Sequence, residues 1–70
     1  MTDRRGEVYV ARWTEEHLYV VVERVFDDLD GPVATYFDPY GWRLICLTGG
    51  KDVRVHENLL ANPLRFKRFA

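Results

Sequence analysis

The chain consists of short apolar runs rich in β-branched and aromatic residues, separated by clusters of glycine, proline and acidic residues. Such runs are typical of β-strands, and the polar clusters are typical of the turns between them. The pattern predicts strands over residues 7–13, 33–37, 42–48 and 52–56. Two stretches, FDPYGW at 37–42 and TGGKD at 48–52, predict tight hairpins, the first with Gly41 at a positive φ.

The segment WTEEHLYVVVERVFDDLDGP, residues 13–32, fits both a helix and a strand. A helix over 15–29 would begin after Thr14, end before Gly31, and align six apolar residues at helical spacing: Leu18, Val21, Val22, Val25, Phe26 and Leu29. The β-branched residues in it would cost about 2 kcal/mol relative to alanine. Three aspartates would also lie at the negative end of the helix dipole. A strand explains the valines, but its alternation fails unless a bulge or bend lies near 22–24.

The layout of residues 6–42 resembles that of Tudor-type domains in the SH3-like small-barrel group. The matching positions are Gly6, Trp13, Tyr19, Phe37, Asp38, Tyr40 and Gly41. Pro39 interrupts the usual spacing of the corner, and Trp42 replaces an asparagine that is common there. The resemblance implies a strand for the ambiguous segment, and a methylated lysine or arginine as the kind of ligand. We therefore predict a mostly β fold, either a five-stranded SH3-like small barrel or a strongly bent antiparallel sheet, with a short C-terminal helical turn at ENLLA. The competing prediction is a β-α-β-β-β arrangement with a helix over 15–29.

Length and composition predict one small domain over residues 1–70, in which 47% hydrophobic residues and ten aromatics fill one core. Cys46 is the single cysteine, so an internal disulfide is excluded and a reducing compartment is favoured. The longest apolar run, Leu18 to Val22, is too short to span a bilayer, and no apolar leader is evident. We expect a cytoplasmic protein.

Charge is distributed unevenly along the chain, although the net charge is only −1. Residues 1–38 hold nine acidic and four basic side chains, a balance of −5, whereas residues 39–70 hold two acidic and six basic ones, a balance of +4. This asymmetry suits either a charged partner or pairing between the two halves.

Catalysis has little support in the sequence. His17 and His56 lie far apart without a second ligand at a useful spacing, and Cys46 lies in an apolar run where it is expected to pack as a small hydrophobe. The acidic cluster between Phe26 and Gly31 lacks the ordered ligand spacing of a calcium loop. We expect no catalytic residues, no metal and no cofactor.

Binding has more support, and the first candidate surface combines rings and acids. If loops 14–17 and 38–41 met at one rim of a barrel, their aromatic residues could form a pocket for a cation. Core packing is the favoured interpretation of Trp13 and Phe37, while Tyr40 and Trp42 suit pocket and core equally. The predicted partner-binding residues are Tyr19, Tyr40, Trp42, Asp27, Asp28, Asp30 and Asp38.

The second candidate surface is the basic and aromatic tail at residues 62–70. Basic residues interleaved with rings suit single-stranded nucleic acid or an acidic protein surface. The residues concerned are Arg65, Phe66, Lys67, Arg68 and Phe69, together with Arg43 and Arg54. A purely structural interpretation is a last strand or helix that docks Leu64, Phe66 and Phe69 onto the domain.

These features predict a non-enzymatic protein-protein interaction domain, acting as a small accessory subunit or as an inhibitor that occupies a site on a larger partner. Phage and mobile-element proteins of this size often act in that way. The competing prediction is a small barrel that binds single-stranded nucleic acid through its C-terminus. An open edge strand would also allow a homodimer, and no membrane association is expected.

Overall fold

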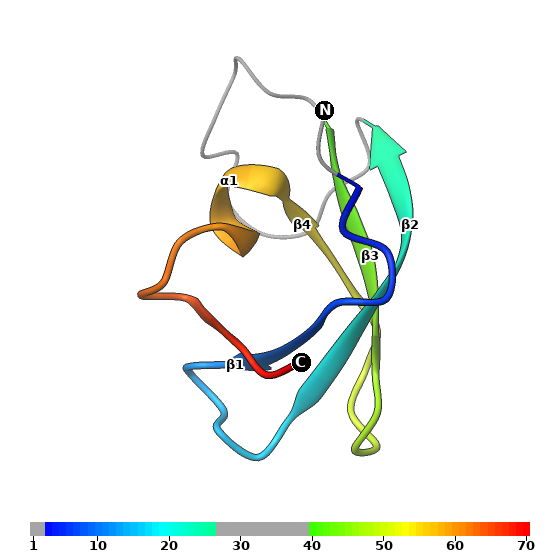
Figure 1. Ribbon diagram of the computed structural model, residues 1–70. Coiled ribbons are helices and arrows are strands. Elements are labelled where there is room, and N and C mark those ends of the chain that lie inside the picture. Colours follow the sequence, from blue (N-terminus) through cyan, green and yellow to red (C-terminus); the bar gives the residue numbers. More distant parts are fainter. Residues whose placement is uncertain (1–2, 27–39) are drawn as a thin grey trace.

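The computed structural model of the protein describes residues 3–26 and 40–70. Within these residues, five antiparallel strands form one sheet that curls into a half-barrel, and one short helix precedes the last of these strands (Figure 1). The elements are β1 (Val8–Ala11), β2 (Leu18–Phe26), β3 (Tyr40–Cys46), β4 (Val53–His56), α1 (Glu57–Leu60) and β5 (Phe66–Arg68). The predicted mostly β fold with five strands and a helical turn at ENLLA is confirmed.

The order of strands in the sheet is β4-β3-β2-β1-β5. The first four strands form a simple meander, and β5 returns to pair with β1, placing Ala11 opposite Phe66 and Tyr9 opposite Arg68. Beyond β5, the backbone of Ala70 continues this pairing with Val8, whose amide donates to the Ala70 carbonyl at 2.8 Å. The first and last strands therefore form one continuous surface.

Residues 18–26 of the ambiguous segment form β2, so the competing prediction of a helix over 15–29 is wrong. β2 pairs along its length with β3, and its first residues also pair with β1. The register shifts after Val21, which lies opposite Leu44, so that Glu23 lies opposite Arg43 and Val22 is the extra residue of a bulge. The bulge predicted near 22–24 is thereby confirmed. It explains the broken alternation, because one extra residue moves every later side chain to the other face.

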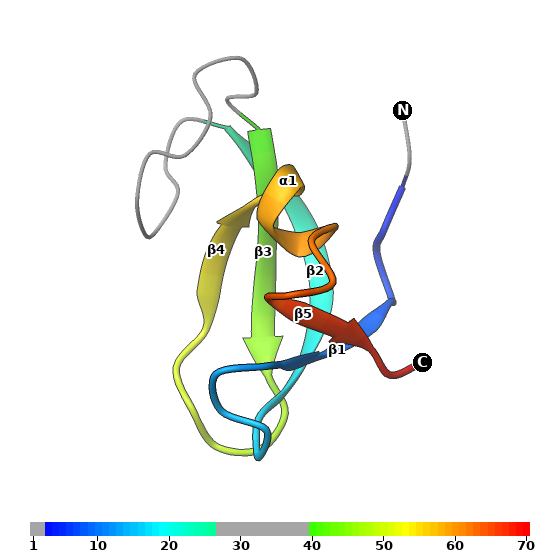
Figure 2. The same cartoon turned by 90° about the vertical axis from the view of Figure 1, so that its left-hand side faces the viewer.

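The core lies on the concave side of the curled sheet. Its side chains are Tyr9, Ala11, Tyr19, Val21, Trp42, Leu44, Val55, Leu60 and Phe66. Leu60 comes from α1, which packs against β3 and β4 on the concave side of the curl (Figure 2). The alternation of half-buried and buried residues in β1 and the first half of β2 follows from strands with one face in the core and the other toward water.

A polar network joins the N-terminal segment to α1 at the edge of the core. The Glu57 carboxylate is buried and accepts hydrogen bonds from Trp42 Nε1 at 2.9 Å and from Arg4 Nε at 2.6 Å. Arg4 also donates to the Tyr9 hydroxyl at 2.9 Å, and that hydroxyl in turn donates to Glu7. Burial and the hydrogen bond to Glu7 raise the pKa of Tyr9. Ion pairing with Glu57 likewise raises the pKa of Arg4.

The two predicted glycine turns have different outcomes. TGGKD forms the turn between β3 and β4, with Gly49 at φ +96°. Gly41, in contrast, lies inside β3 opposite Val25 and His56, so the predicted positive φ at Gly41 is wrong. Residues 37–39 of the predicted hairpin lie outside the described residues. The strand predicted at 33–37 lies outside the described residues.

Within the described part of the chain, no helix has the length and apolar character needed to cross a membrane.

Candidate binding site on strands β1 and β5

Two of the rings predicted to contact a partner belong to the core. Trp42 is only 2% exposed, and Tyr19 is also buried. Tyr40 stands at the start of β3, where its ring lies 4.6 Å from the guanidinium carbon of Arg24 and 6.2 Å from the ring of Phe26. The three predicted rings therefore do not form one surface pocket.

The topology also separates the loops that were expected to meet. Residues 14–17 precede Leu18 at the beginning of β2, whereas Tyr40 and Gly41 lie opposite Phe26 and Val25 at its end. For these residues the expectation of a shared rim is wrong. The remaining predicted positions, Asp27, Asp28, Asp30, Phe37 and Asp38, lie outside the described residues, and the acidic surface stays a prediction.

The expectation that Trp13 packs in the core is wrong. Its side chain is 55% exposed and lies in the turn between β1 and β2. One side of the indole packs edge-to-face on the buried ring of Phe66, with centroids 5.1 Å apart. Trp13 thus covers a core ring while presenting aromatic surface to water.

The middle of the predicted tail forms a strand, in agreement with its structural interpretation. Within β5, Phe66 enters the core, while Lys67 and Arg68 are exposed. Phe69 and Leu64 remain exposed, so of the three apolar residues expected to dock only Phe66 does so. The tail therefore combines an anchoring ring with a solvent-facing basic and aromatic surface.

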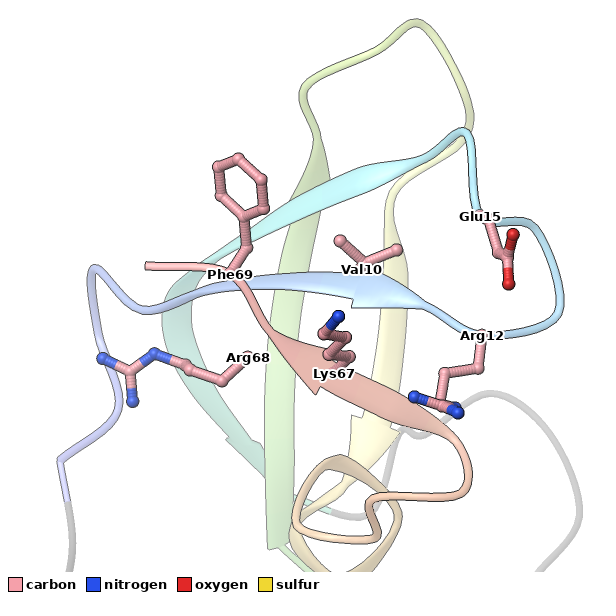
Figure 3. A pocket seen from close by; sticks show the side chains of 6 residues that line it. All are labelled: Val10, Arg12, Glu15, Lys67, Arg68 and Phe69. Carbon is pink, nitrogen blue, oxygen red and sulfur yellow. The ribbon is translucent and has the colours of Figure 1, made fainter.

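A hollow of about 440 Å³ lies on this surface, built by β1, the turn after it, and β5 (Figure 3). Its lining residues are Val10, Arg12, Glu15, Lys67, Arg68 and Phe69. The pairing of Val10 with Lys67 fixes the middle of the hollow. Figure 3 shows Arg12 and Glu15 at one end, and Phe69 with Arg68 at the other. Both ends of the hollow therefore carry charge, and Phe69 adds an apolar ring to one of them.

The charges around this hollow are unevenly neutralised. Arg68 is restrained, because Nε donates to the Ala70 carbonyl at 2.8 Å and a terminal nitrogen lies 3.5 Å from Glu7. Among the described residues, neither Arg12 nor Lys67 has an ion-pair partner, although both are exposed. Glu15 is the single acid among the lining residues. Three cations against one carboxylate make the hollow attractive to anions.

Arg43 and Arg54, predicted to act with the tail, belong to another part of the sheet. They lie opposite one another on β3 and β4, which β2 separates from β1 and β5. Arg43 is paired with Glu23 at 3.1 Å and with Asp52 at 3.7 Å. The structure therefore places these two arginines on other strands than the tail.

The sequence did not indicate that His17 and Cys46 are neighbours. The pairing of β2 with β3 brings the Cys46 thiol to 3.6 Å from His17 Nδ1 and 3.4 Å from the Thr48 hydroxyl. The amide of Gly50 also donates to the sulfur at 3.1 Å. The hydrogen bond from Thr48, together with this amide, lowers the pKa of Cys46 from its ordinary value of 9.0. Within the described residues, no three His, Cys, Asp or Glu side chains are grouped to hold a metal.

Comparison with known proteins adds no relative. A scan of protein-family models, a search of curated proteins and a search of solved structures all gave no match. The case for function therefore depends on the geometry of the β1–β5 hollow. Of its lining residues, Val10, Arg12 and Glu15 were missed because only the return of β5 to β1 brings them beside the tail.

Proposed function

We propose that this chain is a non-enzymatic protein-interaction domain that binds an acidic segment of a larger partner on the β1–β5 hollow. By occupying that segment it acts as an accessory subunit or as an inhibitor. The observation that carries the proposal is the pair Arg12 and Lys67, two exposed cations without ion-pair partners in the described chain, beside the exposed apolar surface of Phe69. Unpaired cations next to a ring fit a surface that awaits an anionic partner.

The distribution of charge supports the same choice of partner. The half of the chain that contains β5, residues 39–70, holds two acidic and six basic side chains, a net charge of +4. Local charge steers association even when the net charge of the whole chain is close to zero.

The test is a pair of charge reversals measured by fluorescence anisotropy with a labelled glutamate-rich peptide. Lys67→Glu reverses a charge in the hollow, and we expect roughly fivefold weaker binding that also becomes less salt-sensitive. Lys51→Glu makes the same change in net charge at an exposed residue of the β3–β4 turn that does not line the hollow, and serves as the control. Equal losses of affinity in the two variants would mean that binding depends only on the net charge of the protein, and the proposed surface would be wrong.

Single-stranded nucleic acid is the second candidate, because two exposed rings accompany the basic residues. Phe69 is 63% exposed, Trp13 presents part of its indole, and Arg65 adds a further exposed cation next to β5. Rings that stack on bases and cations that contact phosphates are the usual components of such surfaces. This candidate is favoured if labelled oligothymidylate binds more tightly than the glutamate-rich peptide at equal salt, and if Trp13→Ala weakens its binding.

A further inference from the structure

One residue that lines the hollow, Glu15, carries a carboxylate, which a general anion-binding site would not require. Glu15 is exposed and lines the hollow beside Arg12, at the end opposite Phe69 (Figure 3). Because no ion pair within the described residues holds its carboxylate, Glu15 presents a negative charge to anything that enters from that end. Glu15 therefore makes its own end of the hollow less favourable for an anion than the middle, where Lys67 lies.

That middle is defined by Lys67 and Val10, which lie opposite one another on β5 and β1. An acidic side chain placed here meets Lys67, and a neighbouring apolar side chain reaches Val10 and the exposed ring of Phe69. Glu15 stays at a distance from a single carboxylate in this position. A polyanion behaves differently, since every nucleotide of a single strand carries a phosphate. When a single-stranded nucleic acid lies along the hollow, some of its phosphates come close to Glu15 while others contact the cations.

We propose that the hollow selects an extended peptide with an isolated acidic residue next to an apolar one, and that Glu15 is the specificity-determining residue that rejects a continuous run of phosphates. This inference rests on the proposed function and deepens it by naming the pattern of the bound segment. It combines attraction at Lys67 with repulsion at Glu15, and discrimination between partners commonly needs both.

The experiment compares three labelled probes by anisotropy at low salt. The first is a short peptide with two separated Asp-Phe pairs in a Gly/Ser background, and the second replaces each Phe with Ala at the same charge. The third is oligothymidylate. We expect the Asp-Phe peptide to bind the unmodified chain roughly fivefold more tightly than the Asp-Ala peptide, because only the first covers Val10 and Phe69 with a ring.

The decisive variant is Glu15→Gln, which keeps the size of the side chain and removes its charge. We expect it to raise the affinity for oligothymidylate roughly threefold and to change that for the Asp-Phe peptide by less than about twofold. Glu16→Gln is the matched control, because Glu16 is the next residue, is exposed, and does not line the hollow. Its effect on oligothymidylate should be clearly smaller than that of Glu15→Gln.

The outcomes separate this inference from the proposed function. Equal gains for both ligands in Glu15→Gln, or equal affinities of the Asp-Phe and Asp-Ala peptides, would overturn the inference. If these peptides still bound more weakly to Lys67→Glu than to Lys51→Glu, the proposed acidic-partner surface would stand without it. If the unmodified chain bound none of the three probes, both this inference and the proposed function would be wrong.

Discussion

The indole nitrogen of Trp42 donates a hydrogen bond of 2.9 Å to the carboxylate of Glu57, and so ties the middle strand of the β2–β3–β4 meander to the start of α1. The same carboxylate accepts two hydrogen bonds from Arg4 Nε. One side chain thereby connects the N-terminal segment, the sheet and the helix. A buried charge is tolerated here because it is both paired and hydrogen-bonded.

Removal of the Glu57 carboxylate should strongly destabilise the fold. Glu57→Ala leaves the Arg4 guanidinium and the Trp42 indole without their acceptor, and breaking a buried pair in this way costs about 3–5 kcal/mol. Urea unfolding followed by circular dichroism measures the loss. Glu16→Ala, at an exposed position, should change the free energy of unfolding by no more than about 0.5 kcal/mol. Similar values for the two variants would contradict a structural role for the Glu57 network.

The Cys46 thiol should react faster at neutral pH than an ordinary exposed thiol. The Thr48 hydroxyl is the largest cause of its lowered pKa, so Thr48→Val should move the midpoint of the alkylation rate against pH to higher values. Iodoacetamide labelling over a pH series, read by mass spectrometry, gives that midpoint. Thr14→Val is the control, since Thr14 lies in the β1–β2 turn and its hydroxyl contacts neither the thiol nor another described partner. An unchanged midpoint in Thr48→Val would refute the assigned cause.

The same lowered pKa has a consequence for stability, whose sign follows from linkage. The folded chain favours the Cys46 thiolate more than the unfolded chain does, because folding lowers the pKa. Stability from this group is therefore fully present above the ordinary value of 9.0 and is lost as the pH falls through the lowered pKa. Unfolding midpoints measured on both sides of this window should differ for the native chain and should differ less for Cys46→Ser.

The turn between β3 and β4 should resist substitution at Gly49. Its φ of +96° is one that side-chain-bearing residues rarely adopt, so Gly49→Ala should cost about 1 kcal/mol although no atom obstructs the added Cβ. Gly49→Asn should lose less, because asparagine tolerates positive φ better than alanine. Thermal unfolding of the two variants measures the difference. Equal stability of Gly49→Ala and the native chain would show that a side chain at this φ causes no strain.

The two tryptophans should be distinguishable by fluorescence. Trp42 is buried and Trp13 is more than half exposed. A Trp13→Phe variant, which keeps only Trp42, should therefore emit at shorter wavelength and resist quenching by acrylamide. A Trp42→Tyr variant, which keeps only Trp13, should emit at longer wavelength and be quenched readily. The opposite assignment of the two spectra would show that the indoles have exchanged environments.

Local pattern was enough to predict β1, β3, β4 and the TGGKD turn, whereas for β2 it fitted a helix as well as a strand with a bulge. In β2, β-branched residues and a single break in the alternation were informative because both reflect neighbours within a few positions. The FDPYGW stretch gave a wrong prediction for Gly41, because local pattern alone indicates a turn there. Gly41 instead lies in β3 and pairs with residues of β2 and β4.

The contact surface was harder to predict, because it depends on which strands become neighbours. Trp13 seemed a core residue by size alone, yet the position of β5 leaves half of its indole in water. Cys46 and His17 are brought together only by the register of β2 with β3. Likewise, Arg12 joins Lys67 only because β5 returns across the sheet to β1. Long-range pairings of this kind have no local signature in the sequence.

The pairing of β1 with β5 also has a kinetic consequence. These strands are more than fifty residues apart in the chain, so closing the loop between them is entropically the most costly step of assembly, and local hairpins are expected to form earlier. A ligand held between Val10 and Lys67 can be recognised only after that closure. It should consequently slow unfolding and raise the denaturant midpoint, which continues to rise with the logarithm of ligand concentration above the Kd.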